Sequence, residues 1–319
     1  MSLASAIIPA KPPARSFPVT QMPALALAAV PGRRKWTVEL AADIERRGFQ
    51  GIYCASFGDS MGLCLSMATA TNEIRFGTMV LPIYYRTAFD LAQSAAYIHE
   101  ISGGRFYLGI GVSHEPSNRR LGVATGKPLS DIRNYVAGLR AAEQQVGPLP
   151  PVVLATLRTK MVGLSVEIGD GAAWANASRS HMAASLSHIP AHRQAGVFFI
   201  GDMLPTCIDD DRDAAAAVMR KQLLGYLMLP NYRNYWKEAG YVEEMAAVEK
   251  ALDARDRDAL PGLMTDRWLA DATLFGTRKD VMEGLEAWFA AGVKTPILVP
   301  SSTKGGQAKA FEEIFAAFA

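Results

Sequence analysis

The stretch that decides the fold is Gly103-Gly104-Arg105-Phe106-Tyr107-Leu108-Gly109-Ile110-Gly111-Val112-Ser113-His114. Its first two glycines predict the end of a helix and a reversal of the chain. The apolar run that follows is typical of a strand buried on both faces, as in a parallel sheet. Gly109 and Gly111 fall on one face of this strand and indicate the close approach of another group. That group is either backbone at a bulge or barrel kink, or a flat ligand at the carboxyl end of the strand.

Strands and helices alternate on both sides of this stretch. Besides the strand that follows Gly104, strands are predicted at 24–30, 51–55, 74–81, 151–155, 171–174, 197–200 and 294–299. Helices are predicted at 36–47, 61–71, 88–101, 130–145, 159–168 and 308–318. Such alternation implies right-handed crossovers and a parallel sheet. Eight strands, each followed by helix, predict an α/β fold of the (β/α)₈ TIM-barrel type.

The connection between the seventh and eighth strands is several times longer than a normal crossover. We expect a helical insertion at about 203–293 within a single barrel domain at 22–319. Its helices are predicted at 212–228, 232–239, 242–252 and 279–291. Asp209-Asp210-Asp211 precedes the first of them, either as a helix cap or as metal ligands. The proline-rich residues 1–21 are predicted to be a flexible arm and not a signal peptide.

The composition excludes several classes of protein. The 319 residues are 50% hydrophobic and 20% charged, which is ordinary for a globular protein. A net charge of +2 argues against a general nucleic-acid binder. No apolar run reaches the roughly 18 residues of a membrane span. Cys54, Cys64 and Cys207 form no Cys-x-x-Cys pair, so we expect buried thiols and a cytoplasmic protein.

The site of such a barrel lies at the carboxyl ends of its strands. This rule selects the residues that follow each predicted strand: Ser56 and Phe57, 80–86, 111–115, 156–160, 176–179 and Asp202. It rejects Arg105, which begins a strand and therefore belongs to the stabilising face.

Cations and hydroxyls gather after the fifth and sixth strands. They are Thr156, Arg158, Thr159 and Lys160 in one turn and Asn176, Ser178, Arg179 and Ser180 in the next. Together with free helix N–H groups, they would suit a phosphate. The alternative is a pair of ordinary capped helix starts.

Other catalytic motifs are missing from the sequence. His181, His188 and His192 could share a helix face. No carboxylate or cysteine lies at a spacing that would add it to that face, so no metal site is predicted. There is also no nucleophile elbow and no Walker loop.

Two segments carry a resemblance to a known family. Ile74-Arg75-Phe76-Gly77-Thr78-Met79-Val80-Leu81-Pro82 and Ser102-Gly103-Gly104-Arg105-Phe106-Tyr107-Leu108-Gly109-Ile110-Gly111-Val112 resemble the third and fourth strands of the bacterial luciferase-like superfamily. That superfamily contains FMN-dependent monooxygenases and coenzyme F420-dependent oxidoreductases. Asp170-Gly171-Ala172, the tyrosine-rich insertion and Ala291-Gly292-Val293 are similar too, and the resemblance covers about residues 24–300.

The resemblance implies a cofactor ring at the carboxyl ends of the strands. A non-proline cis peptide is expected at Met79-Val80, behind the ring. The backbone of Gly111, Val112, Ser113 and His114 would border the ring. The phosphate would then fall near Arg158-Thr159 and 175–179, that is Ala175, Asn176, Ser178 and Arg179. Ser56 follows the second predicted strand and Thr156 follows the fifth, and these two residues complete the predicted cofactor-binding set.

The predicted acid or base is His114, whose ordinary pKa allows either proton state near neutrality, with Glu115 in reserve. The sugar-phosphate dehydrogenase branch of the F420 enzymes has His and Glu where this chain has Phe57 and His114. Oxidation of sugar phosphates is therefore not expected.

The resulting hypothesis is an F420- or FMN-dependent oxidoreductase that passes a hydride between its cofactor and a small organic substrate. F420 is favoured, because the two strand motifs look closest to that branch. The alternatives are an FMN-dependent monooxygenase using O₂ and a non-catalytic flavin-binding protein. A barrel lyase or aldolase acting on a phosphorylated substrate lacks a convincing Schiff-base lysine. The resemblance also implies a homodimer.

Overall fold

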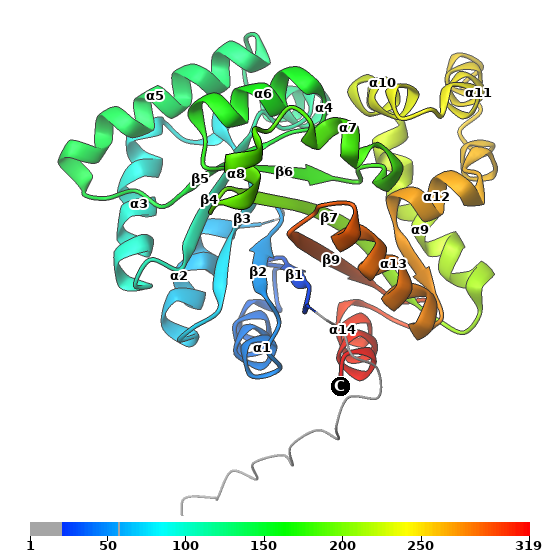
Figure 1. Ribbon diagram of the computed structural model, residues 1–319, viewed down its shortest axis with the longest axis horizontal. Coiled ribbons are helices and arrows are strands. Elements are labelled where there is room, and N and C mark those ends of the chain that lie inside the picture. The colour runs from blue at the N-terminus through cyan, green and yellow to red at the C-terminus, as the bar shows by residue number, and fades with distance from the viewer. Residues whose placement is uncertain (1–20, 57) are drawn as a thin grey trace, which may run out of the picture.

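A closed barrel of parallel strands forms the centre of the molecule in the computed structural model, which describes residues 21–56 and 58–319 (Figure 1). The barrel strands are β1 (Ala24–Leu27), β2 (Gly51–Cys54), β3 (Arg75–Pro82), β4 (Phe106–Gly111), β5 (Val152–Ala155), β6 (Gly171–Ala175), β7 (Phe199–Ile208) and β9 (Thr295–Ser301). They are hydrogen-bonded in the order β6-β5-β4-β3-β2-β1-β9-β7, and the pairing of β6 with β7 closes the ring. The predicted (β/α)₈ barrel is confirmed.

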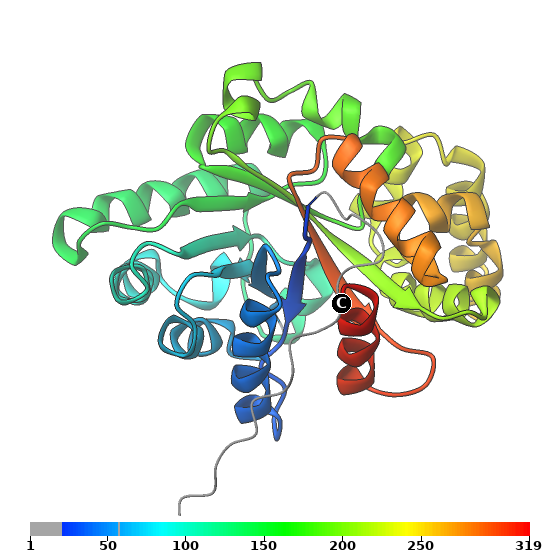
Figure 2. The ribbon, with the colours of Figure 1, turned by 60° about the horizontal axis from the view of Figure 1, so that its bottom comes forward.

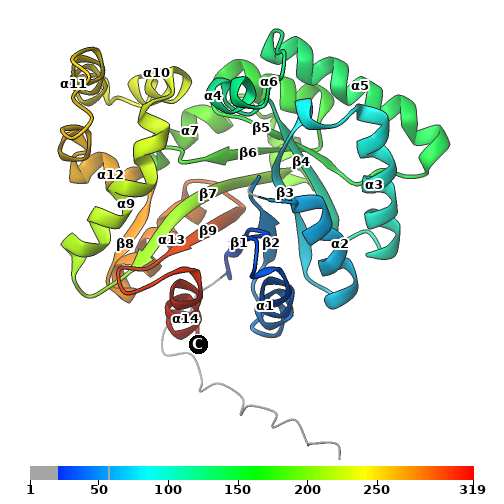
Figure 3. The same cartoon turned by 180° about the vertical axis from the view of Figure 1, so that it is seen from behind.

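Helices surround the barrel (Figures 2 and 3). The larger ones are α1 (Arg34–Arg46), α2 (Ser60–Ala70), α3 (Ala88–Ile101), α5 (Pro128–Val146), α6 (Thr159–Ile168) and α14 (Gln307–Ala317). Shorter turns follow several strands: η1 (Ile83–Tyr85), α4 (Glu115–Arg120), η2 (Arg179–His181), α7 (Met182–Leu186) and α8 (Ala191–Ala195). Of these turns, η1, α4 and η2 begin in the stretches where the sequence places the candidate site.

Strand β7 is longer than predicted. It runs to Ile208, whereas the sequence predicted a strand at 197–200, so residue 203 lies inside the strand and not at the start of an insertion. Asp202 and Pro205 hid this continuation, because aspartate and proline are both depleted in strands. The second half of β7 pairs with β9 and with β8 (Leu274–Gly276), a short strand that the prediction missed.

The connection between β7 and β9 is otherwise helical. It holds α9 (Arg212–Leu227), α10 (Pro230–Glu238), α11 (Val242–Asp253), η3 (Leu260–Leu263), α12 (Asp266–Ala272) and α13 (Arg278–Ala290). Helices α9 to α12 gather on one side of the barrel, at the right of Figure 1 and the left of Figure 3. Asp211 caps α9 by accepting the Ala214 N–H at 3.0 Å, which supports the capping alternative for the acidic triplet.

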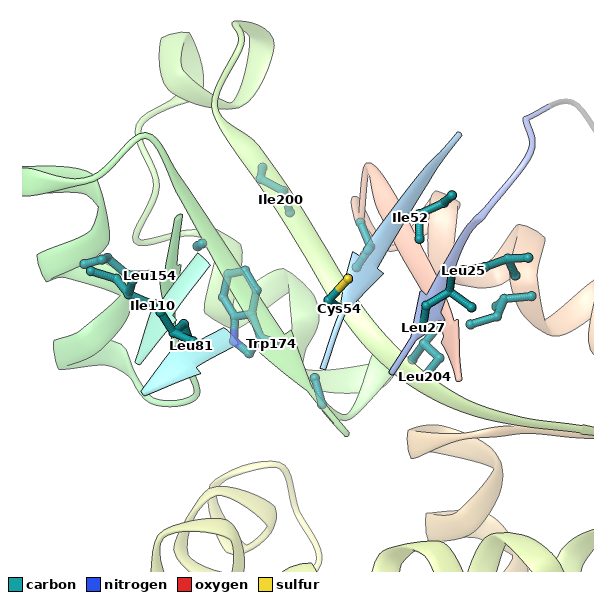
Figure 4. Packing of buried hydrophobic residues seen from close by; sticks show 14 of the residues in the cluster. Leu25, Leu27, Ile52, Cys54, Leu81, Ile110, Leu154, Trp174, Ile200 and Leu204 are labelled. Atoms are coloured by element: carbon teal, nitrogen blue, oxygen red, sulfur yellow. The ribbon is translucent and has the colours of Figure 1, made fainter. Parts of the chain in front are cut away.

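Alternate residues of each strand face inward and outward, as in any barrel. On β1, Ala24 and Ala26 belong to the interior cluster, whereas Leu25 and Leu27 belong to the larger cluster between strands and helices. Figure 4 shows this outer layer, where Ile110, Leu154 and Trp174 pack with side chains of neighbouring strands. The interior cluster comprises Ala24, Ala26, Tyr53, Met79, Val153, Ala173, Phe199 and Ile297.

Arg105 stabilises the amino-terminal end of the barrel, as predicted. Its guanidinium donates to the carbonyls of Ala68, Thr71, Ile74 and Ser102 at 2.8–3.1 Å, and to Thr71 Oγ1 at 2.8 Å. One side chain therefore ties the end of α2 and the start of β3 to the turn before β4.

Gly109 and Gly111 accommodate an irregular β3. The register between β3 and β4 shifts between Thr78 and Leu81. A Cβ on Gly109 would lie 1.9 Å from the Thr78 carbonyl oxygen, and one on Gly111 would lie 3.0 Å from Val80 Cγ2. The bulge alternative therefore accounts for Gly109, whereas a Cβ on Gly111 would first meet Ala155 Cβ of β5 at 2.8 Å.

Three further predictions concern the amino-terminal arm, membrane-spanning helices and the cysteines. Phe57 and residues 1–20 of the predicted arm lie outside the described residues. Among the residues that the structure describes, no helix is long and apolar enough to cross a bilayer. Cys54, Cys64 and Cys207 are free thiols and buried, as expected.

Candidate active site

Four neighbouring strands bring most of the predicted site residues to one mouth of the barrel. Because β3, β4, β5 and β6 are parallel and adjacent, their carboxyl ends share one edge. Val80, Gly111, Thr156 and Ala175 lie at or next to these ends. The peptide bond between Met79 and Val80 is cis, as the resemblance implied. Ser56 follows β2 and is exposed.

His114 lies just beyond β4, in a turn that is held by hydrogen bonds from Asn118. Asn118 Nδ2 donates to the Val112 carbonyl at 3.0 Å, and the Asn118 N–H donates to the His114 carbonyl at 3.0 Å. Ser113 has a left-handed φ of 60°. Burial lowers the pKa of His114, so its imidazole is neutral at neutral pH and can accept a proton. Glu115 points elsewhere, into an exposed ion pair with Arg119.

Aromatic side chains from α9 and α10 cover His114. The centroid of its ring lies 6.1 Å from that of Tyr226 and 5.9 Å from that of Tyr232, both in edge-on geometry. The two tyrosine rings are 4.9 Å apart, and Trp236 follows at 5.4 Å from Tyr232. Burial raises the pKa of both tyrosines, and the nearby Asn176 amide, which does not reach hydrogen-bond geometry with either hydroxyl, offsets part of that rise. The sequence showed a tyrosine-rich insertion, but nothing in it paired these rings with His114.

The turn after β6 carries unsatisfied polar groups. Asn176 and Ser178 are at most 2% exposed, and Asn176 has a left-handed φ of 56°. Asn176 Nδ2 and Ser178 Oγ are buried without a hydrogen-bond partner in the described part of the chain. Buried polar groups rarely remain unpaired, so these two are suited to an absent ligand. Arg179, which follows directly, forms no ion pair with any residue that the structure describes.

The donors around this turn fit the phosphate of a flavin or deazaflavin cofactor. Amide, hydroxyl and guanidinium groups are the donors that phosphate binds, and the start of α6 lies on the neighbouring strand connection. Arg158, the N-cap of α6, is already engaged: its Nε donates to Glu238 Oε1 at 2.8 Å. Thr159 and Lys160 are exposed, whereas the buried Thr156 hydroxyl donates to the Ala173 carbonyl at 3.4 Å.

Asp202 lies inside β7, in register with Trp174, and not beyond the strand end as predicted. Its carboxyl group is completely buried. The N–H groups of Ala177 and Met203 approach it without reaching good hydrogen-bond geometry, and burial raises the pKa of Asp202 well above its usual range. Asp202 is therefore a buried carboxyl group beneath the turn after β6.

The three histidines after β6 do not form a cluster with other ligands. His181 packs edge-on against Tyr235, with ring centroids 5.6 Å apart. In residues 21–56 and 58–319, no three histidine, cysteine or acidic side chains come together to hold a metal ion.

A cavity of about 360 Å³ opens at the opposite, amino-terminal mouth of the barrel. Its lining includes Gln50, Tyr53, Arg75, Tyr107 and Phe199. Gln50 precedes β2, and Arg75, Tyr107 and Phe199 lie within the first two residues of β3, β4 and β7, at the stabilising end of such barrels. We therefore place the candidate active site at the carboxyl-terminal mouth, where the neutral imidazole and the unpaired donors lie.

Comparison with known proteins bears on the fold and the family of the chain. The chain is 26% identical over 317 residues to a Mycobacterium tuberculosis protein provisionally named a coenzyme F420-dependent oxidoreductase, with 83% of this chain and 91% of that protein covered. The structure of coenzyme F420-dependent tetrahydromethanopterin reductase from Methanopyrus kandleri matches with a TM-score of 0.73 at 17% identity, over 92% of this chain and 97% of that one. The FMN complex of a 3,6-diketocamphane monooxygenase from Pseudomonas putida matches with a TM-score of 0.62 at 14% identity, over 93% and 96%. Residues 24–295 match the family model of luciferase-like monooxygenases, and the chain belongs to that family.

Proposed function

We propose that the protein is an oxidoreductase that passes a hydride between coenzyme F420, or alternatively FMN, and a small organic substrate. The observation that carries this proposal is the pairing, at one barrel mouth, of a neutral imidazole with unsatisfied buried donors. His114 supplies the former, and Asn176 Nδ2 and Ser178 Oγ supply the latter. Membership of the luciferase-like family supports the same reaction class.

The residues around the turn after β6 would hold the cofactor by its phosphate. Asn176, Ser178 and Arg179 offer amide, hydroxyl and guanidinium donors, and the first turn of α6 offers free backbone N–H groups. Met79 and Val80 would lie behind the ring, and 111–114 would border its edge. When bound, the ring supplies the hydride donor or acceptor that no side chain can supply.

His114 would manage the proton that accompanies the hydride. In the direction of alcohol oxidation, the hydride leaves the substrate carbon, the hydroxyl proton moves to an imidazole nitrogen of His114, and a carbonyl remains. Because burial keeps the imidazole neutral, it has the lone pair that this step needs. Tyr226 and Tyr232 exclude water from one side of the His114 imidazole.

Experiments distinguish this function from two alternatives. Titration with F420 and with FMN decides the cofactor, and tight FMN binding without F420 binding would make the FMN-dependent, O₂-using monooxygenase the better reading. A non-catalytic flavin-binding protein would bind cofactor but leave a panel of alcohols and carbonyl compounds unchanged. Repeating the panel with His114→Ala links any turnover to this site.

A homodimer and a cytoplasmic location belong to the same proposal. Helix α3 exposes Phe89, Tyr97 and Ile101, with Tyr97 at 59% exposure, and these residues lie along one side because their spacings are eight and four. An exposed apolar stripe of this kind is typical of a protein interface. The three buried free thiols agree with a reducing compartment. Sedimentation of the wild type and Tyr97→Lys tests the dimer.

A further inference from the structure

An ion pair joins the start of α6 to the end of α10, next to the proposed phosphate site. Arg158 Nε donates to Glu238 Oε1 at 2.8 Å, and Arg158 Nη2 contacts the same oxygen. The side chains are 49% and 38% exposed, so solvent and small ions reach both of them. The cation that the sequence assigned to a phosphate is thus neutralised by a carboxylate 80 residues away in the chain.

Helix α10 also holds the turn that carries the unpaired donors. Tyr235 Oη accepts the Ser178 N–H at 3.0 Å, and Trp236 Nε1 donates to the Asn176 carbonyl at 3.3 Å. Tyr235 and Glu238 are three residues apart, so they lie on the same face of α10, one turn from each other. The Glu238 carboxylate therefore lies one helical turn beyond the tyrosine that holds the turn carrying the donor set.

We infer that Glu238 weakens anion binding at this site, because its carboxylate competes with the anionic group of the cofactor for Arg158. This inference rests on the proposed function, because it assumes an anion site at the turn after β6. Inorganic phosphate and a phosphate monoester such as that of FMN form dianions with more acceptor oxygens than one carboxylate, so they can displace Glu238. A ligand without a phosphate leaves the pair of Arg158 and Glu238 intact, so its affinity should not depend on Glu238.

Removal of the competitor should raise the affinity for anions. Exposed ion pairs of this kind contribute little net free energy, so the gain should be modest, at about two- to fivefold. Glu238→Gln keeps the size and the hydrogen-bonding capacity of the side chain and removes only the charge. Glu167→Gln is a matched control, because Glu167 lies at the other end of α6 and pairs with Arg133 on the surface.

The test is isothermal titration of the full chain with inorganic phosphate. We expect Glu238→Gln to bind phosphate about two- to fivefold more tightly than the wild type, and Glu167→Gln to match the wild type. The double variant Arg158→Gln/Glu238→Gln should lose the gain. Equal or weaker binding by Glu238→Gln, or a gain that survives without Arg158, overturns the inference. So does an absence of phosphate binding in both wild type and Glu238→Gln.

Parallel titrations with F420, FMN and riboflavin separate this inference from the proposed function. A gain for phosphate without binding of any of the three cofactors would support the role of Glu238 and contradict the proposed cofactor. Binding of F420 or FMN that Glu238→Gln leaves unchanged would contradict the role of Glu238 and leave the proposed function standing.

Discussion

Gly109→Ala tests whether the glycine serves the barrel or a ligand. A Cβ at this position would lie 1.9 Å from the Thr78 carbonyl oxygen and 3.1 Å from Met79 Sδ, whereas ordinary contact begins at 3.4 Å. The backbone of β3 would have to retreat, and the hydrogen bond from Thr78 Oγ1 to the Gly109 carbonyl at 2.7 Å would be strained or lost. Overpacking costs about 1–3 kcal/mol and a lost hydrogen bond about 1 kcal/mol, so we expect a loss of about 3 kcal/mol in the free energy of unfolding.

Urea denaturation followed by circular dichroism measures this loss. Gly163→Ala is the matched control, because a Cβ there meets nothing within 4 Å and Gly163 lies inside α6. Alanine is the better helix former, so Gly163→Ala should stabilise the protein by about 0.5–1 kcal/mol. If Gly109→Ala unfolds like the wild type but binds cofactor more weakly, the packing explanation is wrong and the ligand alternative is restored.

Three further predictions follow from the described contacts. Arg105→Ala should lower the free energy of unfolding by about 3 kcal/mol, because several buried carbonyls lose their donor, while the dissociation constant of the cofactor stays unchanged. Asp209, bound by Thr303 and Lys304, has its pKa lowered to about 2. Asp209→Asn should therefore cost about 2 kcal/mol at pH 7, and its difference from the wild type in urea unfolding should shrink as the pH falls from about 4 toward 2. If His114 is the base, the rate of alcohol oxidation should be full above the lowered pKa of His114 and fall below it, with an inflection under about 6.5 that His114→Ala removes.

The barrel was predictable because its strands have a simple signature. Buried parallel strands must be apolar on both faces, and their helices follow at a regular spacing, so even the weak pattern at 171–174 indicated β6 correctly. The end of β7 was not predictable in this way. Asp202 and Pro205 read as the end of a strand, although Pro205 is in register with Val299 and Asp202 is buried in the strand.

The sequence likewise predicted one part of the candidate site and not the other. Residues at strand ends were found because topology alone brings parallel ends together. The contacts that define their chemistry join residues far apart in the chain, such as His114 with Tyr226 and Arg158 with Glu238. No local pattern encodes such pairs, so neither the neutral imidazole nor the occupied guanidinium could be foreseen from the sequence.

The most direct test of the central claim is a titration of the purified full chain with coenzyme F420 and with FMN, followed by absorbance and fluorescence. We predict that each chain binds one F420 in a saturable manner and that FMN binds more weakly than F420. In the double variant Asn176→Ala/Ser178→Ala, the affinity for F420 should fall at least tenfold. A chain that binds neither F420 nor FMN, or that binds them equally well without these two side chains, would contradict the account.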